Sequence, residues 1–313
     1  MERVIVGSRG VMRRVRQARQ VSWARRLPRR LKVGALLLVV LVLAAAAGPP
    51  VFGLNPYKMD PNAILQGPTL AFPFGTDDYG RSILARVLFG ARTSFEIAAV
   101  VCACTSVVGL VLATASVLVG PVDGVVMRLV DGLMALPAVV MALALVTIVG
   151  AGFGEVVIVE SLFFLPWSIR IMRSSMLSVE HRAYVEAAVS QGATGRWVVR
   201  RHILPNAAGP VVVEQVLIFG YAILAEAVLS FLGVGIEAPA ASLGNMLSEA
   251  QPLMLQDPLF SVFPGVIIGL VVFGVNLLAD GVAENLNVVR AGLGVSVGSG
   301  GLGVGGASSQ AVE

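Results

Sequence analysis

Charged residues are scarce in this sequence. They make up 13% of its 313 residues, whereas apolar residues make up 56%. A soluble globular protein has about 25% charged residues. So few charged side chains cannot form the water-facing surface of a soluble protein of this length. The composition therefore excludes an ordinary water-soluble fold and indicates a membrane protein.

Cysteine and histidine are also rare, with two residues of each. Cys102 and Cys104 lie two positions apart in an expected membrane helix, so their side chains point to separate faces and cannot bridge each other. We interpret them as small apolar packing residues. His181 and His202 are isolated along the chain, and two isolated histidines make no metal site. The sequence therefore predicts no bound metal.

In place of charge, the sequence has long apolar runs. They are about 20 residues long and nearly free of charge, enough to cross a hydrocarbon core about 30 Å thick as a helix. They do not alternate apolar with polar residues, as the strands of a membrane β-barrel do. The expected fold class is all-α, a polytopic membrane helix bundle with six transmembrane helices. The expected spans are 33–54, 94–119, 125–149, 153–172, 211–232 and 259–278.

The N-terminal segment, residues 1–32, is strongly basic. Ten basic residues lie between Arg9 and Lys32 with no acidic residue among them. Such a run can bind nucleic acid, but its place beside the first apolar block favours a cytoplasmic anchor on the anionic inner leaflet. The basic flank and Ala44 to Ala47 also resemble a signal peptide, which we expect to be retained because more spans follow. We therefore expect a multi-pass protein of the cell membrane with both termini in the cytoplasm.

Two further segments lie outside the expected spans. Residues 55–93 form a polar extracytoplasmic segment punctuated by Pro and Gly, in which Ile83, Leu84, Val87 and Leu88 have helical spacing. That spacing predicts an amphipathic helix on the outer surface. The tail at the other end of the chain is rich in Gly and Ser and has no apolar periodicity. It is predicted to be disordered and cytoplasmic, and it comprises residues 291–313.

The core of five spans, residues 94–290, contains a long cytoplasmic loop, residues 173–208. This loop exceeds thirty residues, whereas connections between helices are usually about 2 to 8 residues long. Several positions in it favour two short helices. A long loop with its own ordered structure usually binds a partner, so this loop is the candidate interaction site.

The first short helix is expected over residues 184–190, with Ser178 able to cap it and Gly192 at its left-handed end. Ala187 and Ala188 leave a small, flat surface that another protein can approach closely. A second helix is expected nearby. It covers residues 194–202 and ends before Pro205, because the proline ring blocks continuation.

The loop has a specific residue pattern. Glu186, Ala187 and Ala188 are followed after three residues by Gly192, and nine residues later comes the run His202, Ile203, Leu204, Pro205. This pattern resembles the signature loop of binding-protein-dependent ABC importer permeases. Four further motifs resemble the dipeptide and oligopeptide branch of that family, and more narrowly its C-type permease subunit. They are Gly75 to Arg81, Met127 to Asp131, Leu229 to Gly235 and Asn276 to Gly281.

The sequence departs from the family pattern at two places. Family members often have Trp before Gly244, where this chain has Leu243, and their last helix commonly ends in Asp-Pro, where this chain has Asn287 and Val288. Neither departure lies in the loop. The first lies in an outer segment that can face a binding protein, so it affects the details of docking and substrate choice.

The resemblance implies a type I ABC importer permease fold and a set of partners. They are a second homologous permease subunit, two P-loop ATPase subunits, an extracytoplasmic peptide-binding protein and the peptide itself. The first short helix then sits in a groove of an ATPase subunit, where Glu186 pairs with a basic residue. Closure of the ATPases on ATP drags spans four and five and opens the pore outward. The residues implied in this coupling are Glu186, Ala187, Ala188, Gly192, His202, Leu204 and Pro205.

The chain has no Gly-x-x-x-x-Gly-Lys-Ser/Thr phosphate loop, and its only lysines, Lys32 and Lys58, lie in no such context. We therefore expect that it is not an enzyme, that it binds no cofactor, and that ATP and Mg²⁺ bind the partner subunits. No interaction with nucleic acid is expected.

Charged residues within or near the spans are candidates for the translocation path. A charge at a helix centre costs about 2.5 to 3.5 kcal/mol on insertion scales, so each needs a partner or water. Glu160 and Glu226 lie deepest, where they can line the path, receive the α-amino group of a peptide, or contact the partner permease. Four charges close to the predicted helix ends are interpreted as interfacial or structural, and they are Asp131, Glu155, Glu214 and Asp280. Glu96 and Arg170 also lie within or near the spans.

Peptides are the expected cargo, with nickel chelates and opines as alternatives in the same branch. A secondary transporter or channel driven by an ion gradient is expected to show an internal repeat or paired interrupted helices, and we find neither in the sequence. The long cytoplasmic loop also has no role in such a protein. A membrane scaffold, the third interpretation, moves no solute in any complex.

Overall fold

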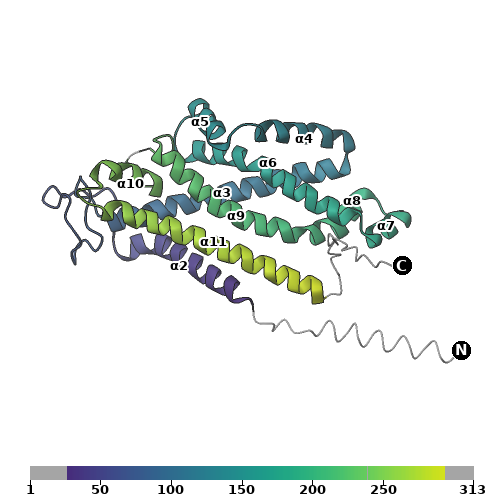
Figure 1. The fold of residues 1–313 in the computed structure, drawn as a ribbon, viewed down its shortest axis with the longest axis horizontal. Coiled ribbons are helices and arrows are strands. Elements are labelled where there is room, and N and C mark those ends of the chain that lie inside the picture. The colour runs from purple at the N-terminus through teal and green to yellow at the C-terminus, as the bar shows by residue number, and fades with distance from the viewer. Residues whose placement is uncertain (1–26, 238, 293–313) are drawn as a thin grey trace, which may run out of the picture. The chain divides into compact units, whose positions relative to one another are not determined.

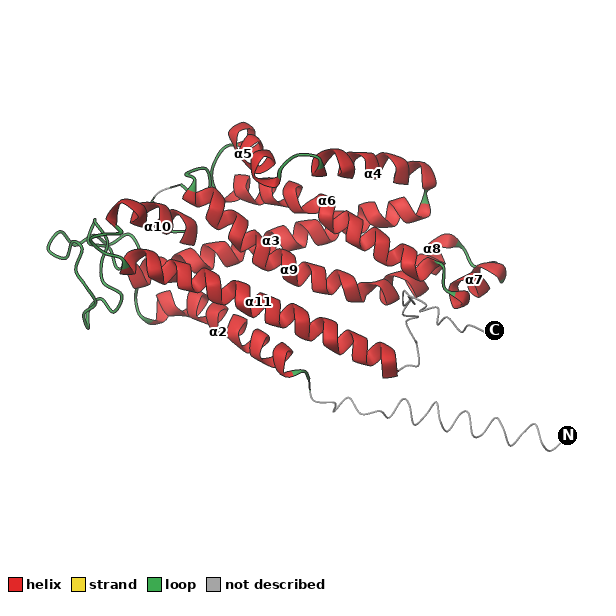
Figure 2. Cartoon of the chain, viewed as in Figure 1, coloured by secondary structure: helices red, strands yellow, loops and turns green. Residues whose placement is uncertain are grey.

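Helices form nearly all of the regular structure of this chain (Figure 2). The structure is a computed structural model that describes residues 27–237 and 239–292. Most of the predicted basic segment and nearly all of the predicted disordered tail therefore lie outside the described residues. Within the described ranges there is no strand, which confirms the all-α class. The description below concerns Leu27–Ala283, which form one unit.

The helices follow one another with short connections except in two places, before α3 and before α10 (Figure 1). A 3₁₀ turn, Gln251–Leu253, follows α10, and a π-helical turn, Val199–Ile203, joins α8 to α9. The α-helices are α2 (Arg29–Val51), α3 (Ile83–Leu118), α4 (Gly120–Met134), α5 (Ala138–Val149), α6 (Phe153–Glu180), α7 (Ala183–Ser190), α8 (Gly195–Val198), α9 (Leu204–Phe231), α10 (Leu243–Ala250) and α11 (Leu259–Gly292).

Four helical stretches of the described chain are long and apolar enough to cross a membrane. α6 has 28 residues, which is also long enough, but the half of the helix that ends at Glu180 also carries Arg170 and Arg173. The predicted third span, 125–149, is not one helix. It is divided into α4 and α5 at Pro137, whose backbone is extended (φ −57°, ψ 131°) because proline cannot continue the preceding helix. The four stretches are Arg29–Val51, Ile83–Leu118, Gly195–Phe231 and Leu259–Leu286.

α3 begins much earlier than the predicted second span. Ser82 caps it by accepting a hydrogen bond from the backbone N–H of Ala85, and the helix then continues for 36 residues to Leu118. Its length of about 54 Å exceeds the thickness of a bilayer core. The prediction of a separate amphipathic helix on the outer surface is therefore wrong. No helix breaker separates Leu88 from the span, and Ile83 and Val87 are buried rather than spread on a surface.

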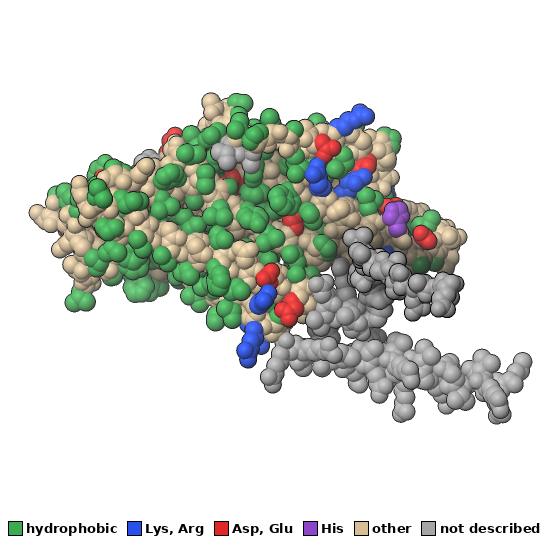
Figure 3. All heavy atoms as spheres, in the orientation of Figure 1, with side chains coloured by type: hydrophobic (Ala, Val, Ile, Leu, Met, Phe, Trp, Pro, Cys, Tyr) green, Lys and Arg blue, Asp and Glu red, His purple; other side chains and the backbone are tan. Residues whose placement is uncertain are grey.

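The centre of the unit is formed by α3, α6 and α9, which make the most extensive contacts among the described helices. Their apolar side chains form one continuous core with α10 and α11. α10 lies at one end of this unit and α7 with α8 at the other (Figure 1). On the face shown in Figure 3, hydrophobic side chains cover most of the surface, and many of the charged ones gather toward the end with α7 and α8. Representative core residues are Ile97, Val156, Ile223, Phe260 and Val271.

α2 and α11 approach each other closely at two glycines. A Cβ atom on Gly34 would lie 2.6 Å from the backbone nitrogen of Leu278, and one on Gly281 would overlap the backbone of Leu31. Next to this contact the Nη1 atom of Arg30 lies 3.2 Å from Oδ2 of Asp280, an exposed ion pair. The motif Asn276 to Gly281 thus has a packing role, and Asp280 is a structural charge, as the sequence analysis interpreted it.

α10 also packs closely against α9 at a glycine, Gly244. A Cβ atom on Gly244 would overlap the carbonyl oxygen of Ala227 and lie 2.7 Å from the Ala227 Cα. The neighbouring Leu243 is fully buried. The departure from the family pattern at Leu243 therefore changes the core beneath α10 rather than an outer contact surface.

The close contact at Gly244 predicts the effect of Gly244→Ala. The added methyl group must push α10 away from α9, so we expect a loss of stability of about 1 to 3 kcal/mol. Gly132→Ala is the matched control, because no atom lies within 4 Å of the Cβ position there. That change removes a helical glycine and is expected to be neutral or slightly stabilising. Thermal unfolding of the purified protein in detergent checks both, and equal shifts would contradict the packing described here.

Candidate functional site

The cytoplasmic loop of the sequence analysis contains α7, α8 and the π-helical turn. The first predicted helix, 184–190, is confirmed as α7. The predicted cap is wrong, because Ser178 lies inside α6 and its hydroxyl donates to the carbonyl of Ser175 (2.7 Å). α6 extends to Glu180, beyond the predicted end of span four, and Arg182 precedes α7 without a capping side chain.

Gly192 ends α7 in the left-handed conformation predicted for it, with φ of 85°. Its N–H donates to the carbonyl of Val189 (2.9 Å), and the N–H of Ala193 donates to the carbonyl of Ala188 (3.1 Å). These two bonds form a Schellman motif, which satisfies the last carbonyl groups of a helix. A side chain at Gly192 has open space but is strained by the backbone.

α7 buries one apolar side chain against the rest of the chain. Val185 is only 2% exposed and packs with residues of α6, α8 and the π-helical turn, among them Met176 and Val198. Glu186 and Ala187 are exposed, while Ala188 is half-buried. α7 thus presents a carboxylate and a small residue to the outside, while Val185 packs its other face against the chain.

The second predicted helix does not end before Pro205. From Gly195 the chain runs through α8, the π-helical turn and α9 to Phe231 as one helical stretch. The turn widens the helix before the proline, with the N–H of Leu204 bonded to the carbonyl of Val199, and Pro205 occupies the first turn of α9, where its missing N–H costs little. The prediction of a helix end is wrong, and the loop is joined directly to span five.

His202 lies between aromatic rings from the two short helices. Its ring centroid is 6.0 Å from that of Tyr184 on α7 and 5.1 Å from that of Trp197 on α8. Leu204 packs against the same apolar cluster as Val185. The residues singled out in the loop therefore fall into two groups. Glu186 and Ala187 face outward, whereas His202 and Leu204 hold α7 against the start of α9.

A cavity of about 500 Å³ lies beside α7, between it and the end of α3. It is lined by apolar side chains such as Leu118 and Val189 and by the carboxyl-bearing residues Glu180 and Glu186. A second hollow of about 430 Å³ lies on the other side of the helix end, at Gly192 and Trp197. The exposed helix is thus flanked by two depressions that a partner's side chains can fill.

Two ion pairs join α4 to α6 near the same end of the unit. Arg173 donates two hydrogen bonds to the carboxylate of Asp123 (2.5 and 2.6 Å), and Arg170 donates one to Asp131 (2.5 Å). The Arg173–Asp123 pair is partly buried, whereas the Arg170–Asp131 pair is exposed, and exposed pairs stabilise by at most about 1 kcal/mol. They give the motif Met127 to Asp131 a structural role, in agreement with the interpretation of Asp131 from sequence.

The two acids proposed from sequence for the translocation path differ in their surroundings. Glu226 is 0% exposed and accepts hydrogen bonds from the hydroxyl groups of Ser94 (2.6 Å) and Ser230 (2.7 Å). Glu160 is 1% exposed, and neither of its carboxyl oxygens has a hydrogen-bond partner among the described residues. Glu214 is also buried without a partner in the described part of the chain. The structure thus separates a satisfied acid from two unsatisfied ones.

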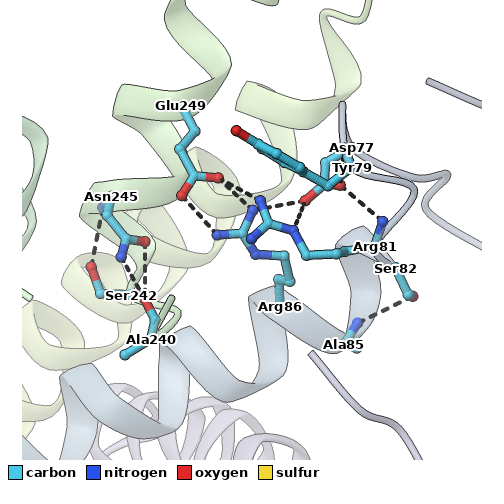
Figure 4. A network of polar contacts seen from close by, with 10 residues as sticks. All are labelled: Asp77, Tyr79, Arg81, Ser82, Ala85, Arg86, Ala240, Ser242, Asn245 and Glu249. Carbon is cyan, nitrogen blue, oxygen red and sulfur yellow. Dashed lines mark hydrogen bonds and ion pairs between the residues drawn. The ribbon is translucent and has the colours of Figure 1, made fainter. Parts of the chain in front are cut away.

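At the opposite end of the unit a largely buried network of charges holds the segment before α3, residues 52–82, to α10 (Figure 4). The carboxylate of Asp77 accepts from Nε of Arg81 (2.7 Å) and Nη1 of Arg86 (2.8 Å), and also from backbone N–H groups. Both guanidinium groups also donate to Glu249 on α10 (2.5 to 3.1 Å). Burial and the neighbouring Asp77 raise the pKa of the Asp78 carboxyl. The motif Gly75 to Arg81 is therefore a structural clamp.

Sequence reasoning quoted this motif but missed its role. The spacing of Asp77, Arg81 and Arg86 along the chain was a visible signal, because a buried arginine needs an acid. Their partner Glu249 is more than 160 residues away in sequence, so no pattern in the neighbouring sequence indicates this contact. Among residues 27–237 and 239–292 no group of three side chains is placed to hold a metal ion.

The comparisons with known proteins fit this arrangement. A family model described as the binding-protein-dependent transport system inner membrane component matches residues 105–288, more than half of the chain. The chain belongs to this family. The match includes the whole loop, residues 173–208, and begins after the motif at Asp77. Membership makes the chain a multi-pass membrane transport permease, and it confirms the resemblance drawn from the loop pattern.

Two curated relatives cover most of the chain. The dipeptide transport system permease protein of Alkalihalophilus pseudofirmus is 33% identical over 256 residues, which are 82% of this chain and 84% of that protein. The glutathione transport system permease protein of Pectobacterium atrosepticum is 34% identical over 274 residues, 85% of this chain and 89% of that protein. This permease family therefore includes relatives named for peptide substrates.

A solved structure shows the same fold. A chain of the MetNI methionine ABC transporter, solved in inward-facing conformations, aligns with a TM-score of 0.54 at 16% identity, over 66% of this chain and 95% of its own length. At that identity the likeness concerns the fold alone. The expected type I ABC importer permease fold is thereby confirmed.

Proposed function

We propose that this chain is the transmembrane permease subunit of an ATP-driven importer for di- and oligopeptides. The observation that carries the proposal is the identity of 33 to 34% to permeases named for dipeptide and glutathione transport, over more than four fifths of the chain. The exposed helix α7 supports it, because a chain without a phosphate loop needs a surface on which a separate ATPase acts. Nickel chelates and opines are the alternative cargoes of the same branch.

The partners in this proposal are a second homologous permease, two ATPase subunits that bind ATP and Mg²⁺, and an extracytoplasmic binding protein. α7 lies in a groove of one ATPase, where Glu186 pairs with a basic residue. The end of the unit with α7 and α8 then faces the cytoplasm and the end with α10 faces outward. With six crossings of the membrane, both termini lie in the cytoplasm.

The packing of the loop suggests how motion is passed on. Val185 couples α7 to α6, and the unbroken stretch from Gly195 to Phe231 carries the loop into α9. A movement of α7 therefore acts on both flanking spans, which pack along each other and on α3. In the proposed cycle, closure of the ATPases moves these spans as a rigid body and opens a pore shared with the second permease. Glu160 and Glu226, on α6 and α9, are the proposed residues of its path.

Reconstitution tests the proposal. Proteoliposomes that contain this chain, its partner permease, both ATPase subunits and the binding protein are expected to accumulate a radiolabelled dipeptide only when ATP is supplied. Omission of either permease is expected to abolish uptake. Transport by this chain alone without ATP would refute the proposal and favour an ion-gradient transporter. No flux in any combination would favour a scaffold.

A further inference from the structure

The carboxyl group of Glu160 has an environment that the packing of the chain does not explain. It lies on α6, within the membrane-spanning part of the bundle, and is 1% exposed. Neither oxygen has a hydrogen-bond partner in the described part of the chain. A protonated carboxyl group would leave its O–H without an acceptor, and an ionised one would leave two oxygens without donors. In both states Glu160 needs a group from outside the described residues.

Glu226 provides the contrast. Two serine hydroxyl groups donate to its carboxylate, so its hydrogen-bonding needs are met within the chain. A donor that reaches Glu160 therefore finds a carboxyl group whose two oxygens are both open, whereas the carboxyl group of Glu226 is already held by serine hydroxyl groups. A group with several donors and no acceptor suits Glu160 best.

The space beside Glu160 indicates the shape of that donor. A cavity of about 230 Å³ lies between α5, α6 and α9, and Glu160 is the only ionisable residue among those described that line it. Its other walls are apolar. The cavity is smaller than the roughly 300 to 1,000 Å³ of pockets that enclose a whole drug-sized ligand. It has room for one apolar side chain. The apolar walls include Ala142, Phe163, Leu224, Val228 and Leu229.

We infer that Glu160 and this cavity form a subsite for the N-terminal residue of a transported peptide, with Glu160 receiving the α-ammonium group and the apolar walls receiving the side chain. An ammonium group has three donors and no acceptor, which matches an unpartnered carboxylate. The inference rests on the proposed peptide import. It further assigns a preference for peptides with a free N-terminus and an apolar first residue.

The test uses the purified transporter without its binding protein, so that only the membrane subunits can bind. Phenylalanine amide carries the ammonium and the apolar side chain, and N-acetylphenylalanine amide lacks only the ammonium. The first is expected to raise the melting temperature of the wild-type complex in a concentration-dependent way, and the second is not. Glu160→Gln is expected to weaken binding of phenylalanine amide by about tenfold or more, because a charge-assisted bond is lost. Glu160→Asp is expected to retain part of the binding.

Glu155→Gln is the matched control, since it removes the same charge from the first turn of the same helix. It is expected to bind both compounds as the wild type does. Unchanged affinity of Glu160→Gln for phenylalanine amide would overturn the inference. So would loss of the partner permease from the purified Glu160→Gln complex, which would assign Glu160 to the subunit interface. Failure of the wild-type complex to import peptide with ATP would refute the proposed function, whereas ammonium binding in the same preparation would still support the subsite.

Discussion

Replacing Glu186 with alanine is expected to lower ATP-driven peptide uptake by about tenfold or more, while the protein still inserts and assembles with its partners. Glu186 is exposed on α7, and its carboxylate forms no ion pair with another of the described residues. Losing one partner of a buried charge pair in an interface costs about 2 to 5 kcal/mol. The expected loss is therefore one of coupling between ATP hydrolysis and transport, and not one of folding.

Gly192→Asp is expected to have the same effect by another route. The residue at this position has a left-handed backbone, and an aspartate adds a negative charge beside the exposed end of α7. Gly192→Asn is the matched variant, because asparagine tolerates this conformation and adds no charge. It is expected to retain most uptake.

Uptake and ATP hydrolysis are measured together in vesicles that contain the full complex. Both uncoupled variants are expected to keep the ATPase subunits bound on purification. Glu96→Ala removes an exposed acid far from the loop in sequence and is expected to transport normally. Wild-type uptake by both Glu186→Ala and Gly192→Asp would show that α7 is not where the ATPase acts.

The second large effect is expected at the end of the unit that contains α10. Asp77→Ala removes the carboxylate that lies between Arg81 and Arg86, of which Arg86 is only 1% exposed. Glu249 alone then faces two guanidinium groups. Breaking a buried ion pair by removal of one partner destabilises a protein by about 3 to 5 kcal/mol, because it leaves a buried charge uncompensated. We expect the segment between α2 and α3 to detach from α10.

Thermal unfolding in detergent and limited proteolysis between residues 52 and 82 measure this effect. The variant is expected to unfold at a lower temperature and to be cut faster in that segment. Glu96→Ala again serves as the control, since its partner Arg92 is about half exposed and such surface pairs contribute at most about 1 kcal/mol. Equal melting temperatures for the two variants would show that the ion pairs of Asp77 do not stabilise the protein.

Local chemistry was enough to predict several elements. The Schellman end at Gly192 followed from the need for a residue without Cβ, and α7 followed from a run of good helix formers. The two wrong helix predictions also came from local sequence patterns. Pro205 does stop many helices, but here a π-helical turn accommodates it at the start of α9. The first turns of α3 have the amphipathic residue pattern of a surface helix, but their apolar side chains are buried, and α10 packs against this helix.

The sequence by itself determined that this is an all-α membrane permease of the ABC importer class. Long charge-free runs leave no other stable solution in a bilayer, and the loop pattern from Glu186 to Pro205 is specific. Only the tertiary structure decided which charges are satisfied. The clamp of Asp77 and Glu249 and the difference between Glu226 and Glu160 depend on residues far apart along the chain. Hydrogen bonding and burial depend on distance in space, which spacing in sequence does not report.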